Sequence, residues 1–110
     1  MSQNLADLTC EVVKFRDDRD WAQFHSLKDN ALSILIEASE LAEAVRWKAP
    51  EDVPNEKLSE ELADVLYWIL LTAYDREIDL AQALRDKLAT NAERYPVDKA
   101  SGNAKKYDEF

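Results

Sequence analysis

The sequence predicts an all-α protein, on three observations. The chain of 110 residues contains a single glycine, Gly102, although glycine averages about 7% of residues in proteins. It contains no Asn-Gly or Asp-Gly pair of the kind that forms tight β-hairpin turns. Alanine and leucine, which are strong helix formers, together supply 29 residues. A protein built on a sheet with tight hairpins is therefore not expected.

The spacing of apolar residues predicts four helices, because residues three and four apart share one helix face. Asn55 and Asp79 are expected to cap the third and fourth helices, and Pro96 to end the fourth. The expected helices, each with its inward-facing residues, are 4–19 with Leu5, Leu8, Val12 and Phe15; 29–47 with Leu32, Leu35, Ala38, Ala42 and Val45; 56–75 with Leu58, Leu62, Val65, Leu66, Ile69 and Leu70; and 80–95 with Leu80, Leu84 and Leu88.

The remaining segments are expected to connect these helices into one four-helix bundle. The connector DDRDWAQFHSLKDN holds at most a short helical turn, and KAPEDVPNEK is a loop. Residues 1–96 form the expected domain, and residues 97–110 a polar, irregular tail. The second and third helices are apolar on more than one side. This favours association with another copy of the chain over a single chain with a larger core.

The composition excludes several classes of protein. Fourteen Lys and Arg residues against 23 Asp and Glu give a net charge of −9, which argues against binding a nucleic-acid polymer. One cysteine and one histidine exclude a disulfide scaffold and a site with two histidines from one chain. No apolar run reaches the roughly 18 residues of a membrane helix, and the N-terminal segment lacks the features of a secretory signal. A cytoplasmic protein without a membrane partner is expected.

Two acidic pairs are the first candidates for a functional site. Between Glu37 and Asp64 the sequence has nine acids and only three bases. Glu37 and Glu40 lie three residues apart, as do Glu61 and Asp64, so each pair shares one helix face at about 5–6 Å. If the two helices face each other, four carboxylates converge and need a cation such as Mg²⁺, or alternatively Mn²⁺. The alternative is an ordinary solvated face.

Aromatic and basic residues supply the other candidates. Trp21, Phe24 and His25 in the connector either stack on a nucleobase or plug the end of the bundle. Three polar residues of the fourth helix recur at helical spacing and either hold phosphates or form a solvated face: Lys87, Asn91 and Arg94. Tyr95 can pack beside them.

Several of these motifs, taken together, resemble a known family. The segment EASELAEAVRWK followed by EELADVL resembles the ExxE…ExxD pattern of the MazG-like all-α nucleoside triphosphate pyrophosphohydrolases. The segments RDWAQFH, VRWK, KLATNAERYP and AKKY are similar to the short dCTP pyrophosphatase branch of that family. The resemblance extends from about Arg19 to Tyr107.

The resemblance implies a MazG-like four-helix bundle that assembles as a dimer or a dimer of dimers. It implies Mg²⁺-dependent hydrolysis of a nucleoside triphosphate to the monophosphate and pyrophosphate, which controls or cleans the nucleotide pool. The implied metal ligands are Glu37, Glu40, Glu61 and Asp64. Glu40 is the preferred residue to orient or deprotonate the attacking water, with Glu37 as the alternative. The implied substrate-binding residues are Trp21, His25, Trp47, Lys48, Trp68, Lys87, Asn91, Arg94 and Tyr95.

The sequence departs from the family pattern at two positions. Ile36 precedes the first acidic pair where a small glycine is common, and Trp68 stands where the branch often has tyrosine. The second departure bears on the choice of base. The expected substrate is dCTP or a related, modified pyrimidine deoxynucleotide. The alternatives are the same chemistry with another or a broad base preference, and a non-enzymatic helical adaptor whose acids only keep it soluble.

Overall fold

The protein is built from helices joined by short turns and loops over residues 4–109, the part of the chain that the computed structural model describes. The helices belong to two compact units, one ending at Ile78 and the other beginning at Asp79. The first unit contains α1 (Leu5–Asp18), the short 3-10 helix η1 (Ala22–Phe24), α2 (Leu27–Val45), the 3-10 helix η2 (Pro50–Asp52) and α3 (Asn55–Asp75). The second contains α4 (Leu80–Arg94), α5 (Val97–Ala100) and the 3-10 helix η3 (Tyr107–Glu109).

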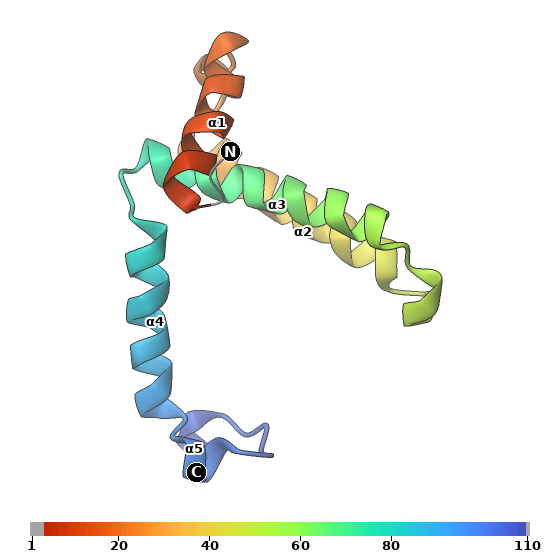
Figure 1. Cartoon of the computed structure of the whole chain (residues 1–110), viewed down its shortest axis with the longest axis vertical. Helices are drawn as coiled ribbons and strands as arrows, with labels where there is room; N and C mark the ends of the chain where they lie inside the picture. Colours follow the sequence, from red (N-terminus) through yellow and green to blue (C-terminus); the bar gives the residue numbers. More distant parts are fainter. Residues whose placement is uncertain (1–3, 110) are drawn as a thin grey trace. The chain divides into compact units, whose positions relative to one another are not determined.

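Helices α2 and α3 lie side by side, and α1 packs against α3 (Figure 1). Their shared core is small, because its buried apolar side chains in the described residues are Val13, Leu70, Leu71 and Ala73. Within residues 4–109, none of the helices combines the length and the apolar character needed to cross a bilayer.

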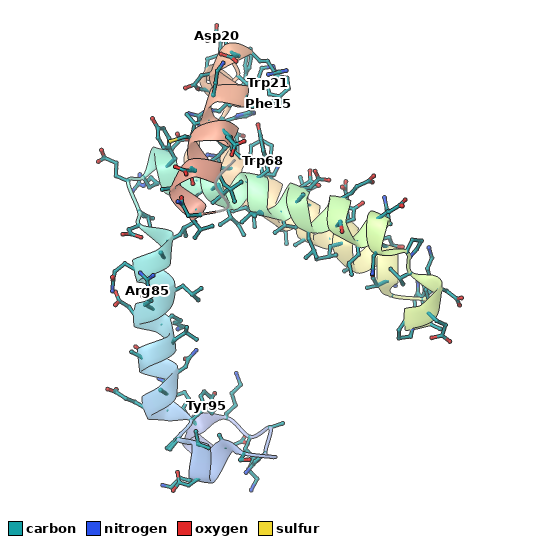
Figure 2. All side chains as sticks on the ribbon, viewed as in Figure 1. Phe15, Asp20, Trp21, Trp68, Arg85 and Tyr95 are labelled. Carbon is teal, nitrogen blue, oxygen red and sulfur yellow. The ribbon has the colours of Figure 1, made fainter. Side chains whose placement is uncertain are left out.

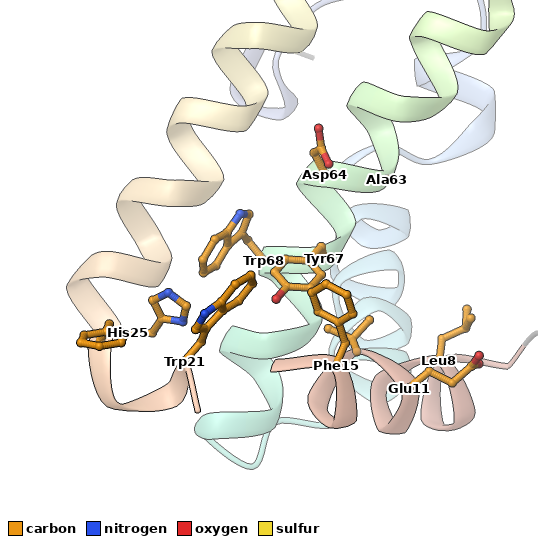
Figure 3. A pocket seen from close by; sticks show the side chains of 11 residues that line it. Leu8, Glu11, Phe15, Trp21, His25, Ala63, Asp64, Tyr67 and Trp68 are labelled. Atoms are coloured by element: carbon orange, nitrogen blue, oxygen red, sulfur yellow. The ribbon is translucent and has the colours of Figure 1, made fainter. Parts of the chain in front are cut away.

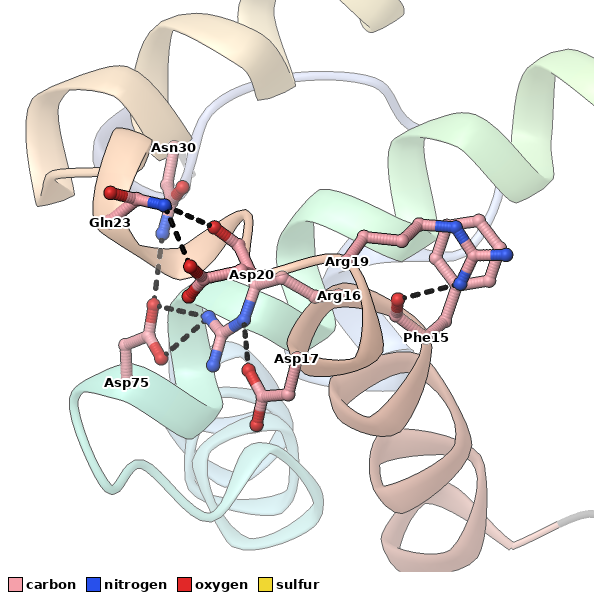
Figure 4. Close-up of polar contacts among 8 residues, drawn as sticks. All are labelled: Phe15, Arg16, Asp17, Arg19, Asp20, Gln23, Asn30 and Asp75. Carbon is pink, nitrogen blue, oxygen red and sulfur yellow. Dashed lines mark hydrogen bonds and ion pairs between the residues drawn. The ribbon is translucent and has the colours of Figure 1, made fainter.

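A buried ion pair holds the three helices of the first unit together at one end (Figure 4). The guanidinium group of Arg16, on α1, donates two hydrogen bonds of 2.8 and 2.9 Å to Asp75 at the end of α3. Asn30 of α2 donates a third hydrogen bond, of 3.3 Å, to the same carboxylate. Arg16 is only 4% exposed, so this paired charge is part of the interior.

The predicted helix boundaries agree with the structure except at α2 and at one cap. Helix α2 begins at Leu27, two residues earlier than expected, because Ser26 and Asp29 form a capping box. The prediction that Asn55 caps α3 is wrong, because Pro54 takes that position and its carbonyl accepts the first helical hydrogen bond, from Leu58. Asp79 caps α4 as predicted, and accepts a hydrogen bond from the Gln82 amide. The tail, expected to be irregular, contains α5 and η3.

Much of the predicted apolar core is exposed in the single chain, so that part of the prediction is wrong for one copy. The face of α2 that meets α3 carries Glu37 and Leu41, whereas Leu35 is 64% exposed. Nine further residues predicted to be inward are also exposed: Leu5, Phe15, Leu32, Ala42, Val45, Leu62, Leu66, Leu84 and Leu88. Isolated helices cannot bury every apolar face within one chain of this length. These apolar side chains are left uncovered in the single chain.

Candidate functional site: an acidic cluster beside an aromatic pocket

Three carboxylates from two helices converge in the middle of the α2–α3 pair. Glu37 on α2 and Glu61 and Asp64 on α3 each place one oxygen within 4.8 Å of the others, and we call these three residues the acidic cluster. The three-residue spacing of Glu61 and Asp64 puts both on the face of α3 that meets α2. The fourth predicted ligand, Glu40, lies outside this limit, but its carboxyl group is near enough to help raise the pKa of Glu37.

The acidic cluster is short of positive charge. Glu61 is only 6% exposed, and one of its oxygens, Oε1, accepts a hydrogen bond of 2.7 Å from the Lys57 ammonium. Its other oxygen and Oε2 of Glu37 are buried and have no hydrogen-bond partner among the described residues. Burial raises the pKa of Glu37, as do its hydrogen bond with Glu40 and the negative charges of the neighbouring acids. Buried, unpaired carboxylate oxygens are the donor set that a hard divalent cation prefers.

A pocket of about 900 Å³ adjoins the acidic cluster (Figure 3). It lies between α1, η1 and α3, and we call it the aromatic pocket. Its lining residues are Leu8, Glu11, Val12, Phe15, Trp21, Phe24, His25, Ala63, Asp64, Tyr67 and Trp68. Asp64 belongs to both the cluster and the pocket, so a ligand bound in the pocket can extend directly to the carboxylates.

The rings of the aromatic pocket pack edge-to-face. Trp68 meets His25 at 4.9 Å and Tyr67 at 5.2 Å between ring centroids. Phe15 meets Trp21 at 5.8 Å and Tyr67 at 6.2 Å, and Figure 2 shows Phe15 and Trp21 together near the end of α1. The guanidinium group of Arg19 also lies over the Phe15 ring at 3.7 Å from its centroid, so an aromatic and cationic wall faces the pocket.

The connector between α1 and α2 holds Trp21 in place through its own hydrogen bonds (Figure 4). Asp20 adopts a left-handed backbone conformation with φ of 54°, which is uncommon for a residue with a side chain. The side-chain amide of Gln23 donates hydrogen bonds to the backbone carbonyl and to the carboxylate of Asp20, at 3.0 and 2.9 Å. The Trp21 amide in turn donates to the carbonyl of Arg16. The turn is therefore fixed where it carries an aromatic wall of the pocket.

Two aromatic residues of this pocket, Phe15 and Tyr67, were not predicted from the sequence as part of a site. Phe15 shares the apolar stripe of its helix, so the pattern assigned it to the core. Tyr67 is three residues after Asp64 and therefore on the same helix face, a signal that could have identified it. Phe24, which was weighed only as a stacking or plugging residue, also lines the pocket.

Trp47 and Lys48 lie away from the aromatic pocket within one chain. Trp47 is 80% exposed, and the guanidinium group of Arg46 lies over its ring at 4.5 Å. The length of α2, at 1.5 Å per residue, separates it from His25 by about 30 Å. Lys48 instead lines a smaller hollow of about 300 Å³ where the chain turns from α2 to α3.

The remaining predicted residues belong to the second unit. Lys87, Asn91 and Arg94 lie on α4, and Tyr95 directly follows it. The Arg94 guanidinium lies over the ring of Tyr107 at 4.6 Å, and Tyr95 meets that ring edge-on at 6.1 Å. Contact of these residues with a substrate stays a prediction.

The fold and site define an all-helical protein in which a cluster of three carboxylates, Glu61 being the buried one, borders an aromatic pocket. The sequence pattern of the MazG-like family matches residues 32–110, which include all four acidic residues named above. The chain belongs to the MazG-like family, as its motifs predicted.

Curated relatives and a solved structure agree with this assignment. The chain is 37% identical to dCTP pyrophosphatase 1 of Mus musculus over 96% of its own length and 67% of that protein. It is 34% identical to dCTP pyrophosphatase 1 of Homo sapiens, with the same coverage. The crystal structure of a pyrophosphatase from Archaeoglobus fulgidus superposes with a TM-score of 0.78 at 31% identity, covering 87% of this chain and 95% of that one.

Proposed function

We propose that the protein hydrolyses dCTP, or a related modified pyrimidine deoxynucleotide, to the monophosphate and pyrophosphate. One observation carries the proposal: Asp64 is shared by the acidic cluster and the aromatic pocket, so one site can hold a base and its phosphates together. The names of the curated relatives support the reaction and the base. The cytoplasmic nucleotide pool is the proposed setting.

The acidic cluster, with Glu40 beside it, would hold one or more Mg²⁺ ions, with Mn²⁺ as a substitute. The fit rests on the buried oxygens of Glu37 and Glu61 that find no partner in the described chain, and on an all-oxygen donor set. Bound Mg²⁺ would neutralise the charge of the triphosphate and would lower the pKa of a water molecule, which makes it a nucleophile near neutral pH.

The carboxylates would accept the proton of the attacking water. Glu40 orients the water and accepts its proton as the water attacks the α-phosphorus, and pyrophosphate leaves from the opposite side. Glu37 is the alternative base, since burial and the neighbouring acids raise its pKa and favour its holding a proton. In the aromatic pocket Trp21, His25 and Trp68 would stack around the base, joined by Phe15 and Tyr67.

The complete site would include a second copy of the chain. The exposed leucines of α2 and α3 give these helices apolar faces that a dimer, or a dimer of dimers, would cover. Trp47 and Lys48 would then approach the pocket of a neighbouring chain. The proposed phosphate contacts are Lys87, Asn91, Arg94 and Tyr95. In this proposal residues 1–96 form the catalytic domain and residues 97–110 its tail.

Pyrophosphate release from a panel of ribo- and deoxynucleoside triphosphates, with Mg²⁺ and with EDTA, tests the proposal. Fast release from dCTP that EDTA abolishes is the expected result. Equal pyrophosphate release from the triphosphates of all bases would support the broad-specificity alternative. No release from any nucleotide would favour the adaptor. The burial of Glu61 argues against the adaptor, because acids that only confer solubility stay in water.

A further inference from the structure

The cation that accompanies the acidic cluster in the structure is the ammonium group of Lys57. Lys57 lies in the first turn of α3, one helical turn before Glu61. Its Nζ is 2.7 Å from Oε1 of Glu61, a carboxylate whose side chain is only 8% exposed. The Lys57 side chain is half-exposed, so its ammonium group contacts the buried Glu61 carboxylate while part of the side chain stays in solvent.

A second lysine–acid pair with the same spacing shows what is unusual here. Lys14 and Asp18 on α1 also lie four residues apart, at 2.6 Å, but the Asp18 side chain is 55% exposed. Such a surface pair contributes little, because water solvates both charges in any case. The Lys57 ammonium instead neutralises an acid that is removed from water and crowded by Glu37 and Asp64. Its attraction to Glu61, and to Glu60 and Glu40 beyond it, raises the pKa of Lys57 and keeps it charged.

A divalent cation bound to Glu61 would share that carboxylate with the Lys57 ammonium, which occupies Oε1. Two cations on one carboxylate repel each other, and the repulsion is strong where water is excluded. We propose that Lys57 is the resident counter-cation of the acidic cluster, and that a divalent metal must displace its ammonium from Glu61 in order to bind. Lys57 thereby weakens the affinity of the site for the metal while it stabilises the metal-free protein. This inference rests on the proposed function, because it assumes that the cluster is the metal site.

The substitution Lys57→Met tests the inference, since methionine keeps most of the stem and removes the charge. Mn²⁺ alone is the probe, with the free ion counted by electron paramagnetic resonance, so no catalytic turnover is needed. Lys57→Met is expected to bind Mn²⁺ about fivefold more tightly than the wild type. In EDTA the same variant is expected to unfold at a lower temperature, because the acids lose their counter-charge. Lys14→Met removes the matched pair and should leave Mn²⁺ affinity unchanged, and Lys57→Arg should restore the wild-type value.

The opposite signs of the two effects distinguish this role from a structural one. If Lys57 only supports the helix, Lys57→Met will lower the unfolding temperature and leave the Mn²⁺ affinity unchanged or weaker. That result overturns the inference. If the wild type binds Mn²⁺ and Lys57→Met does not tighten binding, the inference fails and the metal site stands. If the wild type and both Lys57 variants bind no Mn²⁺, the inference and the proposed metal site fail together.

Discussion

The hydroxyl group of Tyr67 is buried in the wall of the aromatic pocket. Among residues 4–109 it has no hydrogen-bond partner. Burial raises the pKa of Tyr67, partly offset by the positive charges of Arg16 and Arg19, so the group stays a neutral donor. A buried donor without a partner costs the protein stability.

Removing this hydroxyl should therefore not destabilise the protein. Tyr67→Phe keeps the ring and its edge contacts with Phe15 and Trp68. We expect a free energy of unfolding equal to that of the wild type or higher by up to about 1 kcal/mol, measured by urea denaturation. Tyr74→Phe, on the exposed side of the same helix, is the control. A loss of more than about 1 kcal/mol in Tyr67→Phe would mean that the hydroxyl has a stabilising partner.

For single residues, the sequence was enough to predict the placement of side chains whose positions follow from helix geometry. The three-residue spacing of Glu61 and Asp64 sufficed to place both on one face, and pairing with α2 brought in Glu37. Phe15 required knowledge of how α1 packs against α3, which periodicity does not contain, whereas the three-residue step from Asp64 to Tyr67 was a usable signal. The buried pair of Arg16 and Asp75 was missed for the same reason, because its members lie 59 residues apart.

Among the elements, α2 depends on the capping box at its start. The Asp29 amide donates to Oγ of Ser26 at 3.2 Å, and the Ser26 amide donates to the Asp29 carboxylate at 3.0 Å. The hydrogen bonds from the hydroxyl and the amide of Ser26 hold the pKa of Asp29 below its usual 3.8. The ionised carboxylate therefore stabilises the folded state above that pH, and this contribution is lost as the pH falls through the lowered pKa.

Ser26→Ala should reduce the free energy of unfolding by about 1 kcal/mol at neutral pH. The difference from the wild type should shrink in acid, where Asp29 is protonated in both proteins. Urea denaturation at several pH values measures both effects. Ser39→Ala, in the middle of the same helix, is the control and should not lower stability. A difference that stays constant into acid would show that Asp29 does not take part in the cap.

Helix type and extent were predictable because they depend on local signals. Periodicity located α1 and α4 nearly to the residue, and Pro96 and Asp79 marked boundaries as expected. The errors arose where two signals competed. Ser26 and Asp29 were both able to start α2, and the proline before Asn55 displaced that residue from its expected cap. The inward faces were predicted less well, because an apolar stripe indicates burial without saying against which partner.

For the whole molecule, the exposed apolar faces of α2 and α3 are the feature that one chain does not explain. Leu35, Ile36 and Leu62 are each more than half exposed. Monomeric proteins seldom leave such faces to solvent. We expect association between copies, and Leu35→Glu should weaken it by roughly 100-fold, since a charge is costly in a packed apolar interface.

Analytical ultracentrifugation of Leu35→Glu measures that change. The matched variant Leu35→Met keeps the apolar character and should associate as the wild type does. Helicity measured by circular dichroism should be retained in both variants. A wild type that sediments as a monomer at all concentrations would contradict the prediction and would require another partner for these faces.

The proposed hydrolysis takes place at the acidic cluster and depends on its carboxylates. Two neighbouring residues allow a matched comparison, because Glu61 is buried in the cluster and Glu60 is exposed beside it. The decisive measurement is Mg²⁺-supported pyrophosphate release from dCTP by Glu61→Gln and by Glu60→Gln. We predict that Glu61→Gln loses roughly 100-fold or more of the activity while Glu60→Gln keeps it, with unchanged helicity in both. Activity of Glu61→Gln within about twofold of the wild type would contradict the central claim.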